Sequence, residues 1–167
     1  MKKIILSIIL GIIIPSMTLA SEDARLMKAK INLDDQESLQ RGARNFINYC
    51  LNCHSASYMR YNRLNDIGLS NEEIKKNLLF TTDKVGELMN ISMDPVEAKK
   101  WFGANPPNLT VTARSRGKDW IYSYLRTFYT DESRSLGWNN LVYPNAAMPH
   151  VLWELQGTQE LINGKLE

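Results

Sequence analysis

Cysteine and histidine are scarce in this chain of 167 residues, which has two of each. Two cysteines cannot build the disulfide framework of a small secreted scaffold. A structural zinc site needs four ligands, and the only Cys/His set is Cys50, Cys53, His54 and His150, without a paired second half. The net charge of +2 gives no indication of nucleic-acid binding.

Long apolar runs are also missing. The one such stretch, residues 4–14, is shorter than the ~20 residues that a membrane-spanning helix needs. It follows two lysines and precedes the small residues around Ala20, which is the pattern of a secretory signal peptide. We therefore expect a signal peptide over residues 1–20 and one domain over residues 21–167, with an uncleaved N-terminal anchor as the alternative. Cleavage would remove two lysines and no acids, so the mature chain would be formally neutral.

Both cysteines belong to one motif, Cys50-Leu51-Asn52-Cys53-His54. The order Cys-x-x-Cys-His predicts one covalently attached haem c. Each thiol adds to one vinyl group, and the two-residue spacing lets both sulfurs reach one edge of the porphyrin. His54 then becomes the proximal iron ligand. Export agrees with this interpretation, because bacterial c-type cytochromes mature outside the cytoplasm.

A redox-active dithiol is the competing interpretation of the two cysteines. It requires a strand before the motif and a βαβ context after it, whereas the residues before Cys50 have helical spacing. A disulfide across two residues would be strained and would enclose almost nothing. The haem interpretation is therefore favoured.

Helical periodicity predicts a mainly α fold. Together with the haem motif, it resembles the c-type cytochrome fold, which implies helices wrapped around one covalent haem, with inserted loops. An amphipathic helix of about four turns is expected to run from the Asp34 region into the motif. Three further helices are expected, at the Ser70–Glu73 capping box, after Asp94-Pro95 and over residues 118–129. Residues 130–147 are expected to form a long loop, followed by a last short helix. No convincing strand pattern is present.

Haem iron used for electron transfer generally has a second protein ligand. The candidates are Met27, Met59, Met89, Met93, Met148 and His150. Met59 follows His54 too closely to cross to the opposite face of the ring. Met148 is favoured because it ends the long loop and Pro149 stiffens the chain beside it, which reduces the ordering cost. His150 would give a bis-histidine haem of lower potential, whereas methionine ligation raises the potential.

Four features in chain order resemble the cytochrome c1 family, the haem subunits of quinol–cytochrome c reductase. They cover nearly the whole of the expected mature chain. The features are the haem motif continuing through Ser55, Tyr58, Arg63 and Leu64, the segment Asn105-Pro106-Pro107-Asn108-Leu109-Thr110, the stretch Arg114-Ser115-Arg116-Gly117 before Asp119-Trp120-Ile121-Tyr122, and Pro144-Asn145-Ala146-Ala147-Met148-Pro149.

The resemblance implies specific roles for several residues. Cys50 and Cys53 would bind the haem covalently, and His54 and Met148 would ligate its iron. Arg116, or its neighbour Arg114, would meet a haem propionate, a carboxylate that suits the guanidinium fork. The proline pair would shape the wall of the haem pocket.

The resemblance also implies partners and a location. The chain would accept an electron from a Rieske iron–sulfur protein and pass it to soluble cytochrome c, beside a cytochrome b that oxidises quinol. It would lie on the periplasmic side of the bacterial inner membrane as a subunit that is not catalytic alone. The family's C-terminal transmembrane helix is not found before Glu167, so we expect a fragment or a shortened product, and anchoring through this chain is in doubt.

Two other functions fit parts of the pattern. A free periplasmic monohaem cytochrome c carrier would need no anchor, but such carriers are usually nearer one hundred residues. A haem enzyme such as a peroxidase would need an open sixth position on the iron.

Overall fold

The computed structural model describes residues 26–167, so the predicted signal peptide lies outside the described residues. The described helices are α1 (Gln36–Asn45), α2 (Asn71–Asn77), α3 (Pro95–Phe102), α4 (Thr112–Arg116), α5 (Lys118–Arg126) and α6 (Trp153–Gln156), with a π-helical turn η1 (Phe46–Cys50) and a 3-10 helix η2 (Tyr61–Ile67). The described strands are β1 (Ala56–Arg60), β2 (Leu88–Met89), β3 (Phe128–Thr130), β4 (Trp138–Asn140), β5 (Leu161–Ile162) and β6 (Lys165–Leu166).

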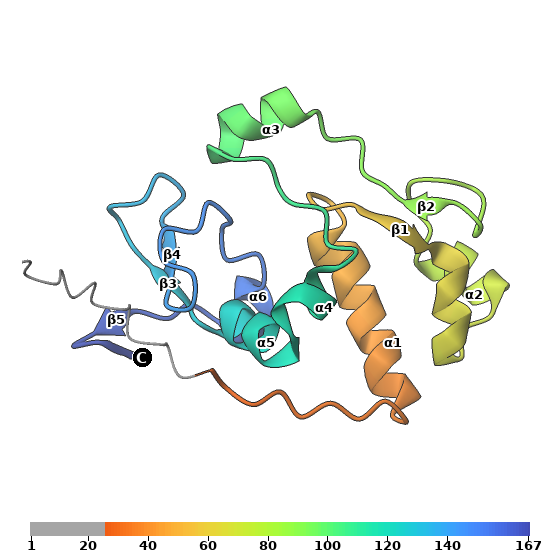
Figure 1. Cartoon of the computed structure of the whole chain (residues 1–167), viewed down its shortest axis with the longest axis horizontal. Helices are drawn as coiled ribbons and strands as arrows, with labels where there is room; N and C mark the ends of the chain where they lie inside the picture. Colours follow the sequence, from red (N-terminus) through yellow and green to blue (C-terminus); the bar gives the residue numbers. More distant parts are fainter. Residues whose placement is uncertain (1–25) are drawn as a thin grey trace, which may run out of the picture.

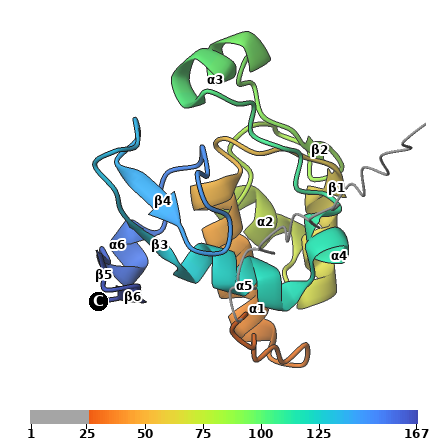
Figure 2. The same ribbon diagram turned by 60° about the vertical axis from the view of Figure 1, so that its left-hand side comes forward.

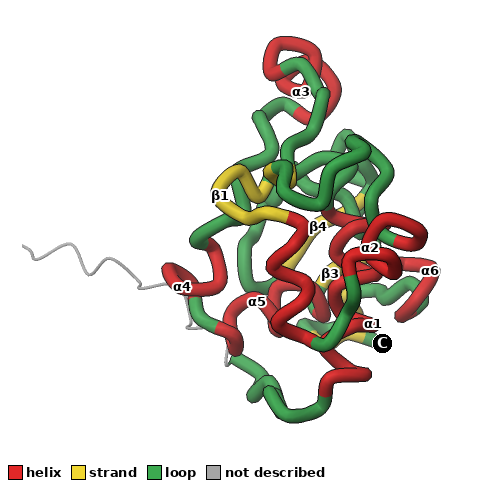
Figure 3. Tube along the Cα trace, turned by 90° about the vertical axis from the view of Figure 1, so that its right-hand side faces the viewer, coloured by secondary structure: helices red, strands yellow, loops and turns green. Residues whose placement is uncertain are grey.

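Helix α1 runs through the middle of the molecule and separates two groups of elements (Figure 1). On one side lie α2 and the β1–β2 pair, and on the other lie α5, the β3–β4 pair and α6. Helix α3 projects away from both groups in the two ribbon views (Figures 1 and 2). Long stretches of loop join these elements (Figure 3), and the candidate site lies within such loops.

Two predicted helix starts are confirmed, and a third is shifted by one residue. Ser70 and Glu73 form a reciprocal capping box at α2, and Asp94 accepts hydrogen bonds from the first turn of α3. At α1 the cap is Asp35 rather than Asp34, and its carboxylate accepts a hydrogen bond from the Ser38 amide. The helix then continues through η1 to Cys50, so the chain enters the Cys-x-x-Cys-His motif from a helix as predicted.

The expectation of no strands was wrong. The described residues contain three two-stranded antiparallel sheets. The strands have two to five residues, which is too short for an alternating pattern to be recognised. Helix α5 also ends at Arg126 rather than at residue 129, because Phe128–Thr130 instead pairs with Trp138–Asn140 inside the predicted long loop.

One compact apolar cluster packs directly behind the motif. Its buried members are Ile47, Leu51, Ala56, Tyr61, Ile74, Leu78 and Met89. Ile47 belongs to η1 and Leu51 lies between the two cysteines, and each is only 4% exposed. The apolar side chains of the motif therefore hold its backbone against α2 and the β1–β2 pair.

A second group, the aromatic cluster, surrounds α5. It comprises Trp120, Tyr124, Phe128, Trp138, Tyr143 and His150. The Tyr124 ring stacks on Trp120 at 5.0 Å between centroids and meets Phe128 edge-on at 5.1 Å. Such pairs stabilise beyond simple area burial. The aromatic cluster packs the loop that ends at Met148 onto α5.

Residues 26–31 are tied to the start of α5. Asp119 accepts hydrogen bonds from the Ala29 amide and the Lys28 ammonium, both at 2.9 Å. These bonds, the Ala29 amide first, hold the pKa of Asp119 well below its usual range.

Within residues 26–167, no helix combines the length and the apolar character that crossing a bilayer requires.

The apolar cluster behind the motif can be tested with one isoleucine. Ile74 is fully buried within it, so Ile74→Ala removes buried methyl groups and leaves a cavity. We expect a loss of about 2–5 kcal/mol in the free energy of unfolding. Urea denaturation followed by far-ultraviolet circular dichroism measures the loss. Ile31, which is 53% exposed, provides the matched control, and an equal loss for Ile31→Ala would contradict the assignment of this core.

Candidate haem site

The Cys-x-x-Cys-His motif forms a tight turn at the end of a helix. The backbone amides of Cys53 and His54 both donate to the Cys50 carbonyl, at 3.1 and 2.9 Å, and the Leu51 amide donates to Phe46. Both cysteines are half-buried and neither forms a disulfide. The turn therefore presents two unpaired thiols and an imidazole within one loop of chain.

The pKa values of the two thiols argue against a redox dithiol. Burial, with a smaller contribution from the charge of Cys53, raises the pKa of Cys50 to about 11. Burial also raises the pKa of Cys53. Reactive dithiols have lowered pKa values, often at the N-terminus of a helix, whereas Cys50 ends the helical segment. The thiols are therefore protonated at neutral pH, which disfavours the dithiol interpretation.

His54 is oriented by the proline pair. Its Nδ1 lies 2.7 Å from the carbonyl oxygen of Pro107. Because a carbonyl can only accept a hydrogen bond, Nδ1 is the donor, and in the neutral ring the lone pair then lies on Nε2. A hydrogen bond at the far ring nitrogen commonly fixes the tautomer of a metal-binding histidine. The hydrogen bond thus orients the imidazole so that Nε2 is available to ligate a metal.

The segment around Pro107 is joined to the chain that follows the motif. The Leu109 amide donates to the Ser55 carbonyl at 2.8 Å, and the Asn108 side chain donates to the Ser57 hydroxyl at 2.6 Å. These bonds connect residues about fifty positions apart. Sequence reasoning expected the prolines to shape a wall, and it missed that Pro107 supplies the acceptor for His54.

Met148 lies on a loop fixed by buried asparagines. The Asn139 side chain accepts a hydrogen bond from the Asn145 amide at 2.8 Å. Asn140, which is 1% exposed, accepts from the amides of Val142 and Tyr143. Sequence reasoning missed both asparagines, and their position within a long loop was the only available signal.

Arg134 also fastens this loop, and sequence reasoning missed it as well. Its guanidinium donates to the side chain and to the carbonyl of Asn145, both at 3.2 Å. Asn145 has a positive φ of 62°, a conformation that asparagine tolerates better than most residues. The bidentate contact therefore holds the residue at which the loop turns toward Met148.

The Met148 thioether is half-buried, and its sulfur accepts a hydrogen bond from the Tyr124 hydroxyl at 3.5 Å. Burial, followed by the nearby Tyr143, raises the pKa of Tyr124 to about 12. The phenol therefore remains protonated, and remains a donor, at neutral pH.

The other candidate ligands are placed less suitably. Met89 is 2% exposed and packs in the apolar cluster behind the motif, while Met59 is 41% exposed on β1. Met27 is 36% exposed, and its amide is bonded to the Ser123 hydroxyl beside α5. Met93 is half-buried just before α3. These positions favour Met148 over the other methionines.

His150 is enclosed in the aromatic cluster. Its ring stacks on Phe128 with 5.3 Å between centroids and meets Trp138 edge-on at 5.1 Å. Its Nε2 lies 3.3 Å from the Gln156 amide nitrogen, which can only donate. Burial lowers the pKa of His150. A neutral histidine whose Nε2 is already occupied is a poor candidate for an iron ligand.

Arg114 and Arg116 lie on α4 and are both exposed. The guanidinium carbon of Arg116 is 4.9 Å from the centre of the Trp120 ring, a cation–π contact. Among residues 26–167, no carboxylate forms an ion pair with either arginine. Both guanidinium groups thus have capacity for an anionic group, and a haem propionate remains the predicted one.

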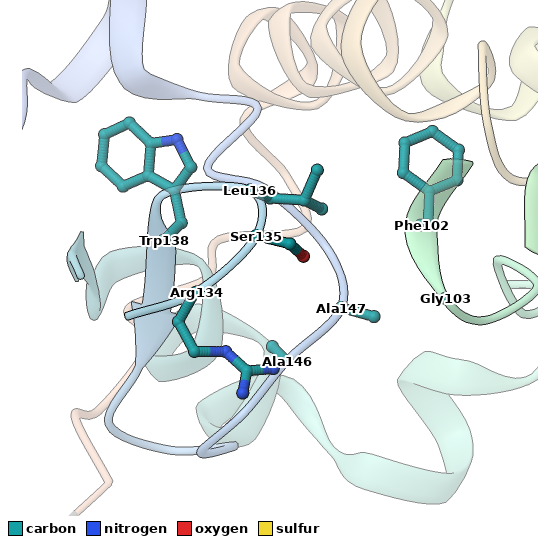
Figure 4. Close-up of a pocket in the computed structure, with 8 residues that line it drawn as sticks. All are labelled: Phe102, Gly103, Arg134, Ser135, Leu136, Trp138, Ala146 and Ala147. Carbon is teal, nitrogen blue, oxygen red and sulfur yellow. The ribbon is translucent and has the colours of Figure 1, made fainter. Parts of the chain in front are cut away.

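A cavity of about 260 Å³ adjoins the Met148 loop (Figure 4). The end of α3, at Phe102 and Gly103, faces it from one side, and Leu136 and Ala147 face it from the other. The Nε of Arg134 is buried nearby without a hydrogen-bond partner in the described part of the chain. Space therefore remains between the loop before Met148 and the end of α3.

A haem c fits the donor set that the structure provides. Two unpaired thiols have the required spacing, one imidazole keeps its Nε2 lone pair free, and one thioether sits on a rigid loop. Zinc does not fit as well, because His150 faces the aromatic cluster and no three His, Cys, Asp or Glu side chains within residues 26–167 are grouped to hold a metal ion. The fold and the donors are those expected of a c-type cytochrome.

Comparison with known proteins identifies the family. The sequence profile described as the Cytochrome C1 family matches residues 27–90. The chain is 48% identical over 164 residues to cytochrome c1 of Allochromatium vinosum, an alignment that covers 97% of this chain and 67% of that protein. The chain belongs to the cytochrome c1 family, which implies a haem cofactor.

Two other relatives also match this chain. A Nitrosomonas europaea protein named ammonia monooxygenase gamma subunit is 52% identical over 145 residues, covering 87% of this chain and 62% of that protein. Cytochrome c1 of Rhodospirillum rubrum is 29% identical over 116 residues, covering 58% of this chain and 43% of that protein. The chain thus spans about three fifths of the Nitrosomonas europaea relative and about two thirds of the Allochromatium vinosum one.

Covalent attachment through two thioethers can be tested at Cys50 and Cys53. We expect the haem-loaded protein to give the pyridine haemochrome spectrum of a haem without remaining vinyl groups. Cys50→Ser or Cys53→Ser should each leave one vinyl group in conjugation with the porphyrin and move the band to longer wavelength. The double substitution should leave haem that acidified acetone extracts. An unchanged band in either single variant would contradict the thioether assignment.

Proposed function

We propose that this chain is the haem-bearing electron-transfer subunit of a quinol–cytochrome c reductase. It would take one electron from a Rieske iron–sulfur protein and pass it to a soluble cytochrome c, while an associated cytochrome b oxidises quinol. The proposal is carried by two side chains that could ligate a haem iron and that are held by hydrogen bonds. His54 donates to the Pro107 carbonyl, and Met148 lies on a hydrogen-bonded loop.

Each residue would have a defined part in holding the group. Cys50 and Cys53 would form the thioether links, His54 would ligate through Nε2, and Met148 would ligate through its sulfur. Arg116, or Arg114, would neutralise a propionate. A haem iron with two protein ligands supplies one-electron chemistry without bonding a substrate.

The protein contributes rigidity to this process. Pro107 holds the His54 ring through a fixed carbonyl, and the buried asparagines hold the Met148 loop. A site that changes little between oxidation states needs little reorganisation, and a methionine ligand raises the reduction potential. These properties support an electron relay better than a peroxidase, which would require an open sixth position.

The proposed location is the periplasmic side of the bacterial inner membrane, reached through the predicted signal peptide at residues 1–20. Family membership and the Cys-x-x-Cys-His motif support this location, because c-type cytochromes are matured after export.

Electron supply to a monooxygenase is a second candidate function, suggested by the name of the Nitrosomonas europaea relative. The free periplasmic carrier is the third.

Isolation of the native assembly distinguishes these roles. We expect the tagged full-length protein, purified from membranes in mild detergent, to carry a cytochrome b and a Rieske protein and to transfer electrons from quinol to cytochrome c. Extraction of the Rieske protein should stop reduction of the c-type haem by quinol, because the haem would receive its electron from the iron–sulfur centre. Recovery alone in the periplasmic fraction, or with monooxygenase subunits, would contradict the proposal.

A further inference from the structure

The Tyr124 hydroxyl makes its only hydrogen bond within residues 26–167 to the sulfur of Met148. A thioether sulfur carries no hydrogen, so the phenol must be the donor. The separation of 3.5 Å is ordinary for a sulfur acceptor, whose radius exceeds that of oxygen. The contact thus joins α5 directly to the predicted iron ligand.

Contacts on several sides hold the Tyr124 ring in place. Trp120 stacks on one face of the ring, with an interplanar angle of 10°, and Phe128 meets it edge-on. The backbone carbonyl of Tyr124 accepts a hydrogen bond from the Asn140 side chain at 2.7 Å. The same asparagine accepts bonds from Val142 and Tyr143 in the Met148 loop. The hydroxyl and the sulfur are therefore positioned by one connected set of buried contacts.

We propose that Tyr124 is a positioning residue that holds the Met148 thioether through this hydrogen bond and thereby raises the reduction potential of the site. The inference rests on the proposed function, in which Met148 is an iron ligand. A thioether sulfur has two lone pairs, so it can accept from Tyr124 with one and ligate iron with the other. The bond restrains the sulfur without competing for ligation.

The direction of the effect follows from charge. A sulfur that accepts a hydrogen bond donates less electron density to iron. Ferric iron depends on that donation more than ferrous iron does, so the bond favours the reduced state. Loss of the hydroxyl should therefore lower the potential and loosen the ligand.

The test uses the full haem-loaded protein with Tyr124→Phe, which keeps the ring and removes only the hydroxyl. Spectroelectrochemical titration should show a lower potential, equivalent to a three- to tenfold change in the ratio of oxidised to reduced protein at a fixed potential. Tenfold corresponds to 59 mV for one electron. Added imidazole should displace the sixth ligand from the ferric variant at a correspondingly lower concentration, because Met148 is held less firmly.

Two controls isolate the contact. Tyr122→Phe removes a hydroxyl from an exposed position on the same helix and should leave the potential unchanged. In the Met148→His background, where no thioether is present, Tyr124→Phe should lose its effect on the potential. An equal fall in that background would show that Tyr124 acts through another route and would overturn the inference.

The failures of the two proposals can be told apart. If Met148→Ala changes the reduced spectrum and the potential but Tyr124→Phe changes neither the potential nor imidazole binding, the inference alone is overturned. If Met148→Ala leaves the reduced spectrum and the potential unchanged, Met148 is not the ligand, and the six-coordinate site and the inference both fail. Circular dichroism and the haem content verify that each variant is folded and loaded.

Discussion

The hydrogen bond between His54 and the Pro107 carbonyl is the constraint on which the rest of the site depends. It joins positions 53 residues apart at 2.7 Å and fixes which ring nitrogen is protonated. Bonds from Leu109 and Asn108 to the chain after the motif hold the segment that carries this acceptor. Without this bond the imidazole could rotate or adopt the other tautomer, and its Nε2 would no longer be reserved for a metal.

The second half of the site depends on buried polar groups rather than on apolar packing. Asn139 and Asn140 replace regular secondary structure by bonding the amides of the Met148 loop. These part-buried hydrogen bonds favour one shape of the loop. The apolar cluster behind the motif and the aromatic cluster around α5 thus each support one of the two predicted ligands.

The sequence was sufficient for the motif, the helix starts and the family, because each depends on local residue order. Cys50 to His54 are contiguous, and the capping residues Ser70 and Glu73 act within one helical turn. It was insufficient for the short strands of the described residues, and for the roles of Pro107, Asn140 and Tyr124. Those features depend on contacts between distant parts of the chain, which no local period encodes. Met148 was suggested as an iron ligand by its place at the end of a long loop. Its contact with Tyr124, and the burial of Met89 and His150 elsewhere, add support from contacts between distant residues.

The central proposal is that His54 and Met148 would both ligate the iron of one haem. Proton NMR of the reduced protein, labelled with carbon-13 in its methionine methyl groups, tests this most directly. A methyl group held above the centre of the haem is strongly shielded by the ring current. We predict one methionine methyl signal shifted far upfield, and its loss in Met148→Ala. Methionine signals confined to their ordinary range would contradict the account.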